Sequence, residues 1–326
     1  MAKFSTVEFP RAASTNQRGA KSKSLSINIV SMPKNIFQRL YRSIPGIHEL
    51  VQIREGLAAL SQKLGELESL RMIELNMRSN PRFTDPRRLL LHGFQVCSQN
   101  QEDGMIHEIF NRIGITGKVF AEIGVGDGVE NNTAFLLSQG WTGFWIDGNP
   151  AMLKMIARRN DLNGGCLRPL VAMVTKENIS QLFERMGVPR EFDLLSLDID
   201  QNTYYAWEGL EKFRPRVVVV EYNGMIPPYV DWKVHHHPER GFDGTNNYGA
   251  SLKALELLGR RLGYSLVGCD FVGVNAFFVR EDLVGDKFAR PFSSENHFEP
   301  FRYGLTHHRG HANSIPDRNA TGNKVD

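Results

Sequence analysis

Two apolar segments in the second half of the chain end in acidic and amide side chains. Asp198 and Asp200 end one segment, and Glu221 and Asn223 end the next. Residues two apart on a strand face the same side, so we expect each pair to converge. Carboxylate oxygens are the ligands that Mg²⁺ prefers, which makes Asp198, Asp200 and Glu221 candidate metal ligands. The alternative is that these side chains bind the ammonium and hydroxyl groups of organic ligands directly.

Three glycines form a second chemical feature. Gly124, Gly126 and Gly128 stand at alternate positions after the apolar stretch Val119–Ile123, which contains Glu122. A polar segment and an apolar helical pattern follow, so the predicted order is strand, glycine turn, helix. This order begins a nucleotide-binding α/β sheet, because glycines permit a sharp turn and let a ligand approach the backbone. The spacing differs from the dinucleotide-binding pattern Gly-x-Gly-x-x-Gly.

Asp147 follows Glu122 by 25 residues and ends the next predicted strand. In nucleotide-binding sheets an acidic side chain at about this spacing accepts the ribose hydroxyls. Ala172 lies at the end of the third predicted strand, where apolar atoms would flank a base. The alternative for Asp147 is an ordinary helix-capping aspartate.

A long polar insertion, at about 223–248, follows the fifth predicted strand and contains three consecutive histidines. We expect this insertion to cover the substrate site. His236 and His237 are candidate general bases, because imidazole titrates near neutrality. A solvated loop is the alternative interpretation.

These residues need a scaffold, and the chain predicts one between residues 119 and 280. Apolar segments alternate with helical patterns there, which predicts an α/β fold with a parallel sheet covered on both faces. The last two segments are close enough to form a hairpin around Gly273. The predicted strands are 119–123, 143–146, 167–174, 192–199, 217–221, 265–270 and 276–280. In such a sheet ligands bind at the carboxyl ends of the strands, where the residues above lie.

Five strand ends in this order resemble those of the class I S-adenosylmethionine (SAM) methyltransferases, and specifically the FkbM-like group. The carrying segments are 122–128, 146–150, 193–200, 217–223 and 248–252, within a block from about Ser98 to Asp282. The resemblance implies a Rossmann-like seven-stranded sheet with SAM as its cofactor. The candidate SAM-binding residues are Glu122, Gly124, Gly126, Asp127, Gly128, Asn131, Asp147, Ala172 and Asp198. Typical FkbM-like members have Asp-x-Glu-Gly after the fourth strand, whereas this chain has Asp198-Ile-Asp200-Gln201.

The resemblance implies methylation of a hydroxyl oxygen on a sugar, a glycan or a natural product. Such a transfer aligns donor and acceptor and removes the hydroxyl proton. The candidate catalytic residues are Asp200, Asn223, His236 and His237. Metal-dependent O-methyltransferases of the catechol and macrocin types hold a divalent ion at similar strand ends, so Mg²⁺ is a second expected cofactor. The rival functions are N- or carboxyl-methylation of a small molecule or protein, and a non-catalytic nucleoside-binding scaffold.

The segments on either side of the predicted catalytic domain have sequence patterns of their own. Residues 1–43 are basic and without periodicity, which indicates a disordered arm able to contact an anionic membrane surface. Residues 44–80 carry apolar side chains at steps of four and three from Ile53 to Leu67. This spacing predicts a coiled coil that joins copies of the chain, or else a helix folded against the catalytic domain. We expect the domain to span 86–288 and a loose polar tail to span 289–326.

The composition narrows the class of protein. The formal net charge is only +3 at pH 7, which gives no case for a nucleic-acid partner. The three cysteines are far apart and lack metal-binding spacing, which is typical of a reducing compartment. No apolar run approaches the roughly 18 residues that suggest a membrane span. We therefore expect a cytoplasmic protein, and the resemblance implies a small-molecule or glycan substrate for it.

Overall fold

The structure is a computed structural model that describes residues 47–77, 80–126, 128, 130–157, 166–238, 241 and 244–302. The expected basic arm, the beginning of the predicted coiled-coil segment, Asp127 and the chain beyond residue 302 lie outside the described residues.

The domain is built on one seven-stranded sheet with the strand order β3-β2-β1-β4-β5-β7-β6. The strands are β1 (Val119–Ile123), β2 (Thr142–Asp147), β3 (Leu167–Val171), β4 (Glu191–Leu197), β5 (Arg214–Glu221), β6 (Tyr264–Cys269) and β7 (Asn275–Arg280). The first five strands are parallel, and β7 is antiparallel to both β5 and β6. This arrangement confirms the predicted Rossmann-like seven-stranded sheet with its terminal hairpin.

Apolar side chains on both faces explain why these segments form central strands. The four consecutive valines of β5, Val217 to Val220, are all fully buried. Val218 and Val220 belong to the core on one face of the sheet, whereas Val217 and Val219 belong to the core on the other. A strand buried on both faces carries a continuous apolar run in place of strict alternation.

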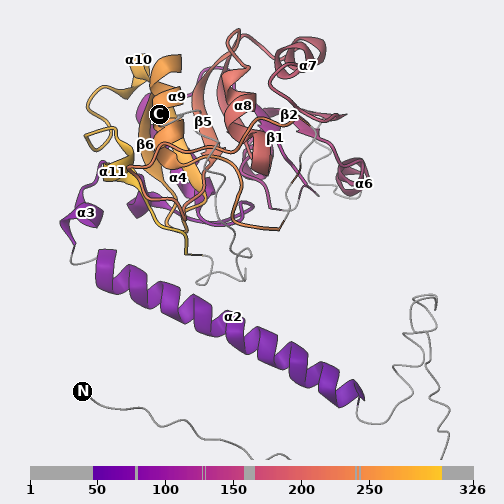
Figure 1. Cartoon of the computed structure of the whole chain (residues 1–326), viewed down its shortest axis with the longest axis vertical. Helices are drawn as coiled ribbons and strands as arrows, with labels where there is room; N and C mark the ends of the chain where they lie inside the picture. The colour runs from indigo at the N-terminus through magenta and orange to yellow at the C-terminus, as the bar shows by residue number, and fades with distance from the viewer. Residues whose placement is uncertain are drawn as a thin grey trace, which may run out of the picture. The chain divides into compact units, whose positions relative to one another are not determined.

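Helices cover both faces of the sheet. The face with Val218 packs against α7 (Ile179–Met186), α8 (Thr203–Glu208) and α9 (Leu252–Leu262). The face with Val217 packs against α4 (Glu102–Ile113), α5 (Ala134–Ser138) and α6 (Ala151–Ile156). Figure 1 shows α8 and α9 lying over the strands. The remaining helices are α2 (Ile47–Met77), α3 (Pro81–Thr84), η2 (Leu89–His92), η4 (Asp200–Asn202), α10 (Glu281–Val284) and α11 (Ser294–His297).

The strand order creates the position for a ligand. The chain moves from β1 outward to β2 and β3, and then returns to place β4 on the other side of β1. A crevice opens beyond the carboxyl ends of the strands at such a reversal of direction, because the two crossover connections leave on opposite sides. The residues that follow β1, β2 and β4 therefore surround one crevice.

A buried ion pair fixes the opposite end of the sheet. Asp193 on β4 accepts hydrogen bonds from the backbone N–H groups of Thr116 and Gly117 at 3.0 and 2.8 Å. Arg216 on β5 donates to Asp193 at 2.8 Å and also to the carbonyl oxygens of Ile113 and Gly114, at the end of α4. These bonds tie the loop between α4 and β1 to the two central strands.

The domain extends beyond both predicted boundaries. Phe83, before the predicted start at 86, belongs to the hydrophobic core. Residues 289–302 pack on the domain where a loose tail was predicted, and Ser294, His297 and Glu299 are buried. The carboxylate of Glu299 lies 3.0 Å from Arg82 and 2.7 Å from Arg302. Ion pairs therefore hold this segment together with the rings of Phe292, Phe298 and Phe301, which pack against the hydrophobic clusters.

Helix α2 is 31 residues long. Among the described helices, none is both long enough and apolar enough to cross a membrane.

Candidate functional site

The glycine loop after β1 touches the segment after β4. Gly124 has a φ of +85°, and a Cβ atom there would lie 1.5 Å from the carbonyl oxygen of Asp198. The backbone N–H of Asp198 donates to the carbonyl of Ile123 at 2.9 Å. Only glycine fits at position 124, because any side chain would collide with the Asp198 backbone.

Asp147, at the end of β2, holds the other side of the glycine loop. Its Oδ2 accepts a hydrogen bond from the backbone N–H of Gly126 at 2.7 Å, and its Oδ1 accepts one from Asn149 at 2.6 Å. Gly126 has a φ of +61°, and no atom lies within 4 Å of where its Cβ would be. The loop is therefore open at Gly126, where a ligand can approach the backbone.

Glu122 points into the protein and organises the loop from within. Its carboxylate accepts hydrogen bonds from the backbone N–H of Asn132 at 3.0 Å and from the Thr133 hydroxyl at 2.5 Å. Burial raises the pKa of Glu122 to about 7, against the opposing effect of its hydrogen bonds. Asn131 donates to the carbonyl of Val125 at 3.2 Å. Both side chains thus shape the glycine loop through protein contacts.

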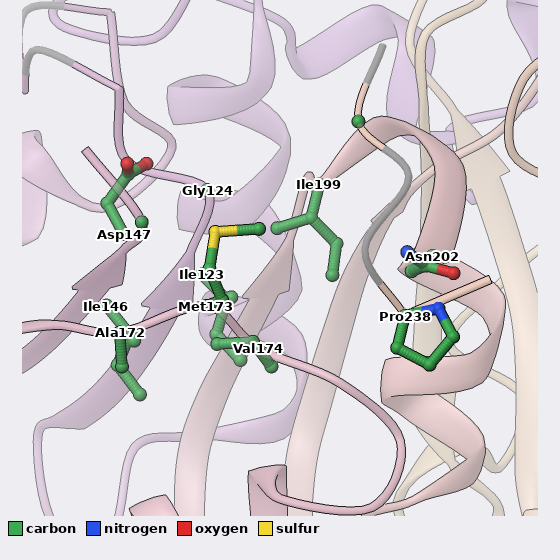
Figure 2. Close-up of a pocket in the computed structure, with 12 residues that line it drawn as sticks. Ile123, Gly124, Ile146, Asp147, Ala172, Met173, Val174, Ile199, Asn202 and Pro238 are labelled. Atoms are coloured by element: carbon green, nitrogen blue, oxygen red, sulfur yellow. The ribbon is translucent and has the colours of Figure 1, made fainter.

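A pocket lies between the glycine loop and the segment after β3. It encloses about 410 Å³ of space between atoms, part of which is open solvent. Figure 2 shows Asp147 on one side, Asn202 and Pro238 on the other, and Met173 and Ile199 between them. The other labelled lining residues are Ile123, Gly124, Ile146, Ala172 and Val174. One charged wall and several apolar walls are suited to a nucleoside.

The predicted acidic cluster forms, but by a different route. Asp198, Asp200 and Glu221 each offer a carboxylate oxygen, and these oxygens lie within 4.8 Å of one another. The expectation that the pleat of a strand aligns Asp198 with Asp200 is wrong, because β4 ends at Leu197. Asp200 instead has a φ of +53° and begins a short 3₁₀-helix. A backbone turn, which non-glycine residues rarely adopt, brings its carboxylate back toward Asp198.

The cluster holds more negative charge than its surroundings balance. Burial raises the pKa values of Asp198 and Glu221, and the neighbouring carboxylates raise them further. The Oε2 atom of Glu221 is buried and has no hydrogen-bond partner among the described residues. Glu221 as a whole is 6% exposed. A buried carboxylate oxygen without a donor is stabilised by a cation, so the three side chains are chemically suited to hold one.

Asn223 lies next to this cluster in sequence, yet its side chain supports the insertion that follows. Its Nδ2 donates to the carbonyls of Asn246 and Tyr248 at 2.8 and 3.1 Å, and its Oδ1 accepts from the backbone N–H of Met225. Gln201 donates to the carbonyl of Asn247 at 3.2 Å. The 244–248 segment is therefore anchored to the ends of β4 and β5.

The two candidate histidines stand apart from the carboxylates. His236 packs against the ring of Tyr205, and its Nε2 lies 3.7 Å from the Glu177 carboxylate. His237 has an exposed side chain, while its carbonyl accepts a hydrogen bond from Asn202 at 3.1 Å. Within the described part of the chain, no histidine belongs to the acidic cluster.

Sequence reasoning missed several residues that line or flank the site. Glu102, at the start of α4, is fully buried, accepts hydrogen bonds from Asn100 and Asn275, and its charge raises the pKa of Asp198. The polar segment before α4 was the available signal for Glu102. Met173 and Pro238, which line the pocket, carry no chemical pattern in the sequence.

Comparison with family models and with curated proteins found no match to this chain. The N-terminal domain of EvdMO1 with SAH bound is similar at 13% identity, over 63% of this chain and 94% of that chain, with a TM-score of 0.37. TrmK from M. capricolum, in complex with S-adenosyl-homocysteine, is similar at 12% identity over 53% of this chain and 65% of that chain, with a TM-score of 0.32. A SAM-dependent methyltransferase from Aquifex aeolicus is similar at 12% identity, over 63% of this chain and 99% of that chain, with a TM-score of 0.30. The fold of this chain is defined by its own strand order.

Proposed function

We propose that this chain is a SAM-dependent methyltransferase that acts on a hydroxyl oxygen. The observation that carries the proposal is the position of Asp147, whose carboxylate lies at the end of β2 on the wall of the pocket beside the glycine loop. This is the place at which a nucleotide-binding sheet presents an acid to ribose hydroxyls.

The pocket residues fit the parts of the proposed cofactor. Asp147 would accept the ribose hydroxyls, and the open side of Gly126 would let the ligand reach the backbone. Ala172 and Val174 would contact the base. When bound, SAM supplies a methyl group on an already activated sulfonium, so the protein's own task is to align, to exclude water and to remove a proton.

The acidic cluster supports a hydroxyl as the acceptor. A hydroxyl loses its proton during transfer, and a base is most effective when its pKa lies near the working pH. Burial raises the pKa of the Asp200 carboxyl above its ordinary value. Asp200 is the proposed general base, while Asn223 positions the insertion to which His236 and His237 belong.

As the alternative to Asp200 acting as the base, we propose that Asp198, Asp200 and Glu221 hold a divalent cation such as Mg²⁺. The fit rests on their separation of at most 4.8 Å and on the partnerless Oε2 of Glu221. A bound cation would lower the pKa of the acceptor hydroxyl and hold it in place. The sugar or natural-product substrate is proposed from the resemblance to the FkbM-like group, and Tyr229, 73% exposed in the insertion, offers a ring for stacking on it.

Calorimetric titration with SAM and with S-adenosylhomocysteine tests the cofactor. We expect micromolar binding by the wild-type protein and at least a tenfold weaker affinity for Asp147→Asn, because a charge-assisted hydrogen bond contributes about 1.5–3 kcal/mol. Asp286→Asn, a matched change on the exposed surface, should leave the affinity unchanged. Wild-type protein that binds neither compound would contradict the proposed function.

Titration with Mn²⁺, followed by electron paramagnetic resonance, tests the cation separately. Binding should be present in the wild type and in the surface control Glu281→Gln, and it should be lost in Glu221→Gln. If the wild type binds no Mn²⁺ while SAM still binds, the acidic cluster contacts organic groups directly and the cation proposal is wrong.

A further inference from the structure

Helix α2 carries one continuous apolar seam on its surface. The seam consists of Leu50, Ile53, Leu57, Leu60, Leu64 and Leu67, and each of these side chains is between 57% and 64% exposed. Their spacing of three and four residues places the first, third and fifth at the a positions of a heptad and the others at the d positions. A run of six exposed aliphatic residues on one helix marks an interaction surface.

The charges beside the seam indicate what binds it. In a parallel pair of helices, a residue at position g faces the residue at e, five positions later, on the other helix. Glu49 and Lys63 occupy g, and Arg54 and Glu68 occupy e. Both charged g residues therefore face a residue of opposite charge when two identical helices pair in parallel and in register, and the third pair, Gly56 and Ser61, is uncharged.

The antiparallel alternative lacks this complementarity. With Leu50 of one helix placed opposite Leu67 of the other, each residue at position e faces a residue at e of the second helix, and each residue at g faces a residue at g. Arg54 would then lie opposite Ser61, and Lys63 opposite Gly56. No pair of opposite charges forms between these positions, so the electrostatic terms favour the parallel arrangement.

The charge of the whole helix argues against a membrane as the occupant. Helix α2 contains five glutamates and three arginine or lysine residues. A helix that lies on an anionic membrane surface is rich in lysine and arginine on its polar face. The mixed and slightly acidic composition of α2 fits a protein partner with the same alternating charges.

We infer that α2 pairs with α2 of a second copy of this chain in a parallel, in-register coiled coil. The Leu and Ile side chains of the seam form its core, and Glu49 and Lys63 contact Arg54 of the partner subunit and Glu68 of the partner subunit. The inference concerns assembly alone and stands independently of the proposed activity.

The mass of the full-length protein in solution is the first test. Light scattering coupled to gel filtration should give at least two chains for the wild type. Leu60→Asp places a charge in the core and should give one chain, whereas Gln62→Asp, on the opposite face of the helix, should leave the mass unchanged. A monomeric wild type would overturn the inference, as would a Leu60→Asp variant that keeps the wild-type mass.

Cysteine substitutions in the seam test the orientation, in a protein whose partly exposed Cys97 and Cys166 are replaced by serine. In the parallel arrangement Leu67→Cys lies beside its own copy and should form an intermolecular disulfide under mild oxidation. In the antiparallel arrangement the two positions 67 are separated by about 25 Å along the helix axis, since they are offset by 17 residues at 1.5 Å each. The parallel orientation would be overturned if the double variant Leu50→Cys/Leu67→Cys forms an intermolecular disulfide and the variant Leu67→Cys does not.

A charge exchange tests the flanking pairs. Lys63→Glu places like charges opposite each other and should raise the dissociation constant by about tenfold. Lys63→Glu/Glu68→Lys restores opposite charges and should recover the wild-type constant. If the double variant is as weak as the single one, the two residues do not face each other and the register is wrong.

Discussion

Gly124 lies where the glycine loop after β1 meets the acidic segment after β4. A methyl group at this position would lie 1.5 Å from the Asp198 carbonyl oxygen, and the backbone there has a positive φ. The contact places the nucleoside pocket and the acidic cluster side by side. The separation between these two parts of the site therefore depends on the absence of a single carbon atom.

Replacing Gly124 with alanine should destabilise the protein severely. We expect a loss of more than about 4 kcal/mol in the free energy of unfolding, because the collision with backbone cannot be relieved by a side-chain movement. Gly140→Ala is the matched control, since Gly140 also has a positive φ but open space around it. The control should cost only about 1–2 kcal/mol in urea denaturation. Equal losses for the two variants would contradict the close approach.

Arg216 provides a second prediction at this scale. Its guanidinium is buried and pairs with the fully buried Asp193. Arg216→Met should cost about 3–5 kcal/mol in the free energy of unfolding, because Asp193 then keeps a buried charge without its partner. Arg190→Met removes an exposed pair with Glu184 and should cost less than about 1 kcal/mol. Urea denaturation compares the two, and similar losses would contradict the importance of burial.

The chemical residues after the strands were predictable from the sequence, whereas their roles were only partly so. Strand ends identified Asp147 and the acids after β4 and β5, because a parallel sheet places such residues at one edge. The sequence did not reveal that Glu122 faces inward or that a turn at Asp200 aligns the carboxylates. Both depend on hydrogen bonds and backbone angles that residue spacing does not encode.

At the scale of elements, apolar runs predicted which segments form strands. They predicted poorly where a strand begins or ends at polar residues. The predicted β1 agrees with the structure at both ends. Strand β5 begins at Arg214, three residues before its predicted start, because Arg216 is buried through its ion pair with Asp193. Strand β3 ends at Val171, before its predicted end, and the apolar residues that follow it line the pocket instead. The ion pair that allows Arg216 to be buried joins two strands, so the sequence of one strand does not reveal it.

The segment 289–302 gives the clearest pH dependence. His297 is buried, and burial lowers its pKa to about 3 from an ordinary value of 6.5. Below pH 6.5 the unfolded chain therefore takes up a proton that the folded protein does not, so stability falls as the pH falls. At pH 5 the wild type should have lost about 2 kcal/mol through this group relative to pH 7.

The measurement is urea denaturation of the wild type and His297→Gln at both pH values. The glutamine keeps a donor for the Ala289 carbonyl, to which the His297 ring now lies at 3.1 Å, and does not titrate. The variant should lose about 2 kcal/mol less than the wild type on acidification. An identical pH dependence would show that His297 is protonated in the folded protein.

At the scale of the whole molecule, assembly and ligand binding should be separable. Every described residue of the pocket and the acidic cluster lies between 123 and 241, whereas the apolar seam of α2 ends at Leu67. The Leu60→Asp variant should therefore bind S-adenosylhomocysteine with an affinity within about twofold of the wild type, measured by calorimetry. A much weaker affinity would mean that a second copy completes the site.

The crystal structure of the protein with S-adenosylhomocysteine tests the central claim most directly. The account predicts the nucleoside in the pocket of Figure 2, with the Asp147 carboxylate within hydrogen-bonding distance of both ribose hydroxyls and the base against Ala172 and Val174. A ligand bound elsewhere, or one in this pocket that does not contact Asp147, would contradict the proposed cofactor site.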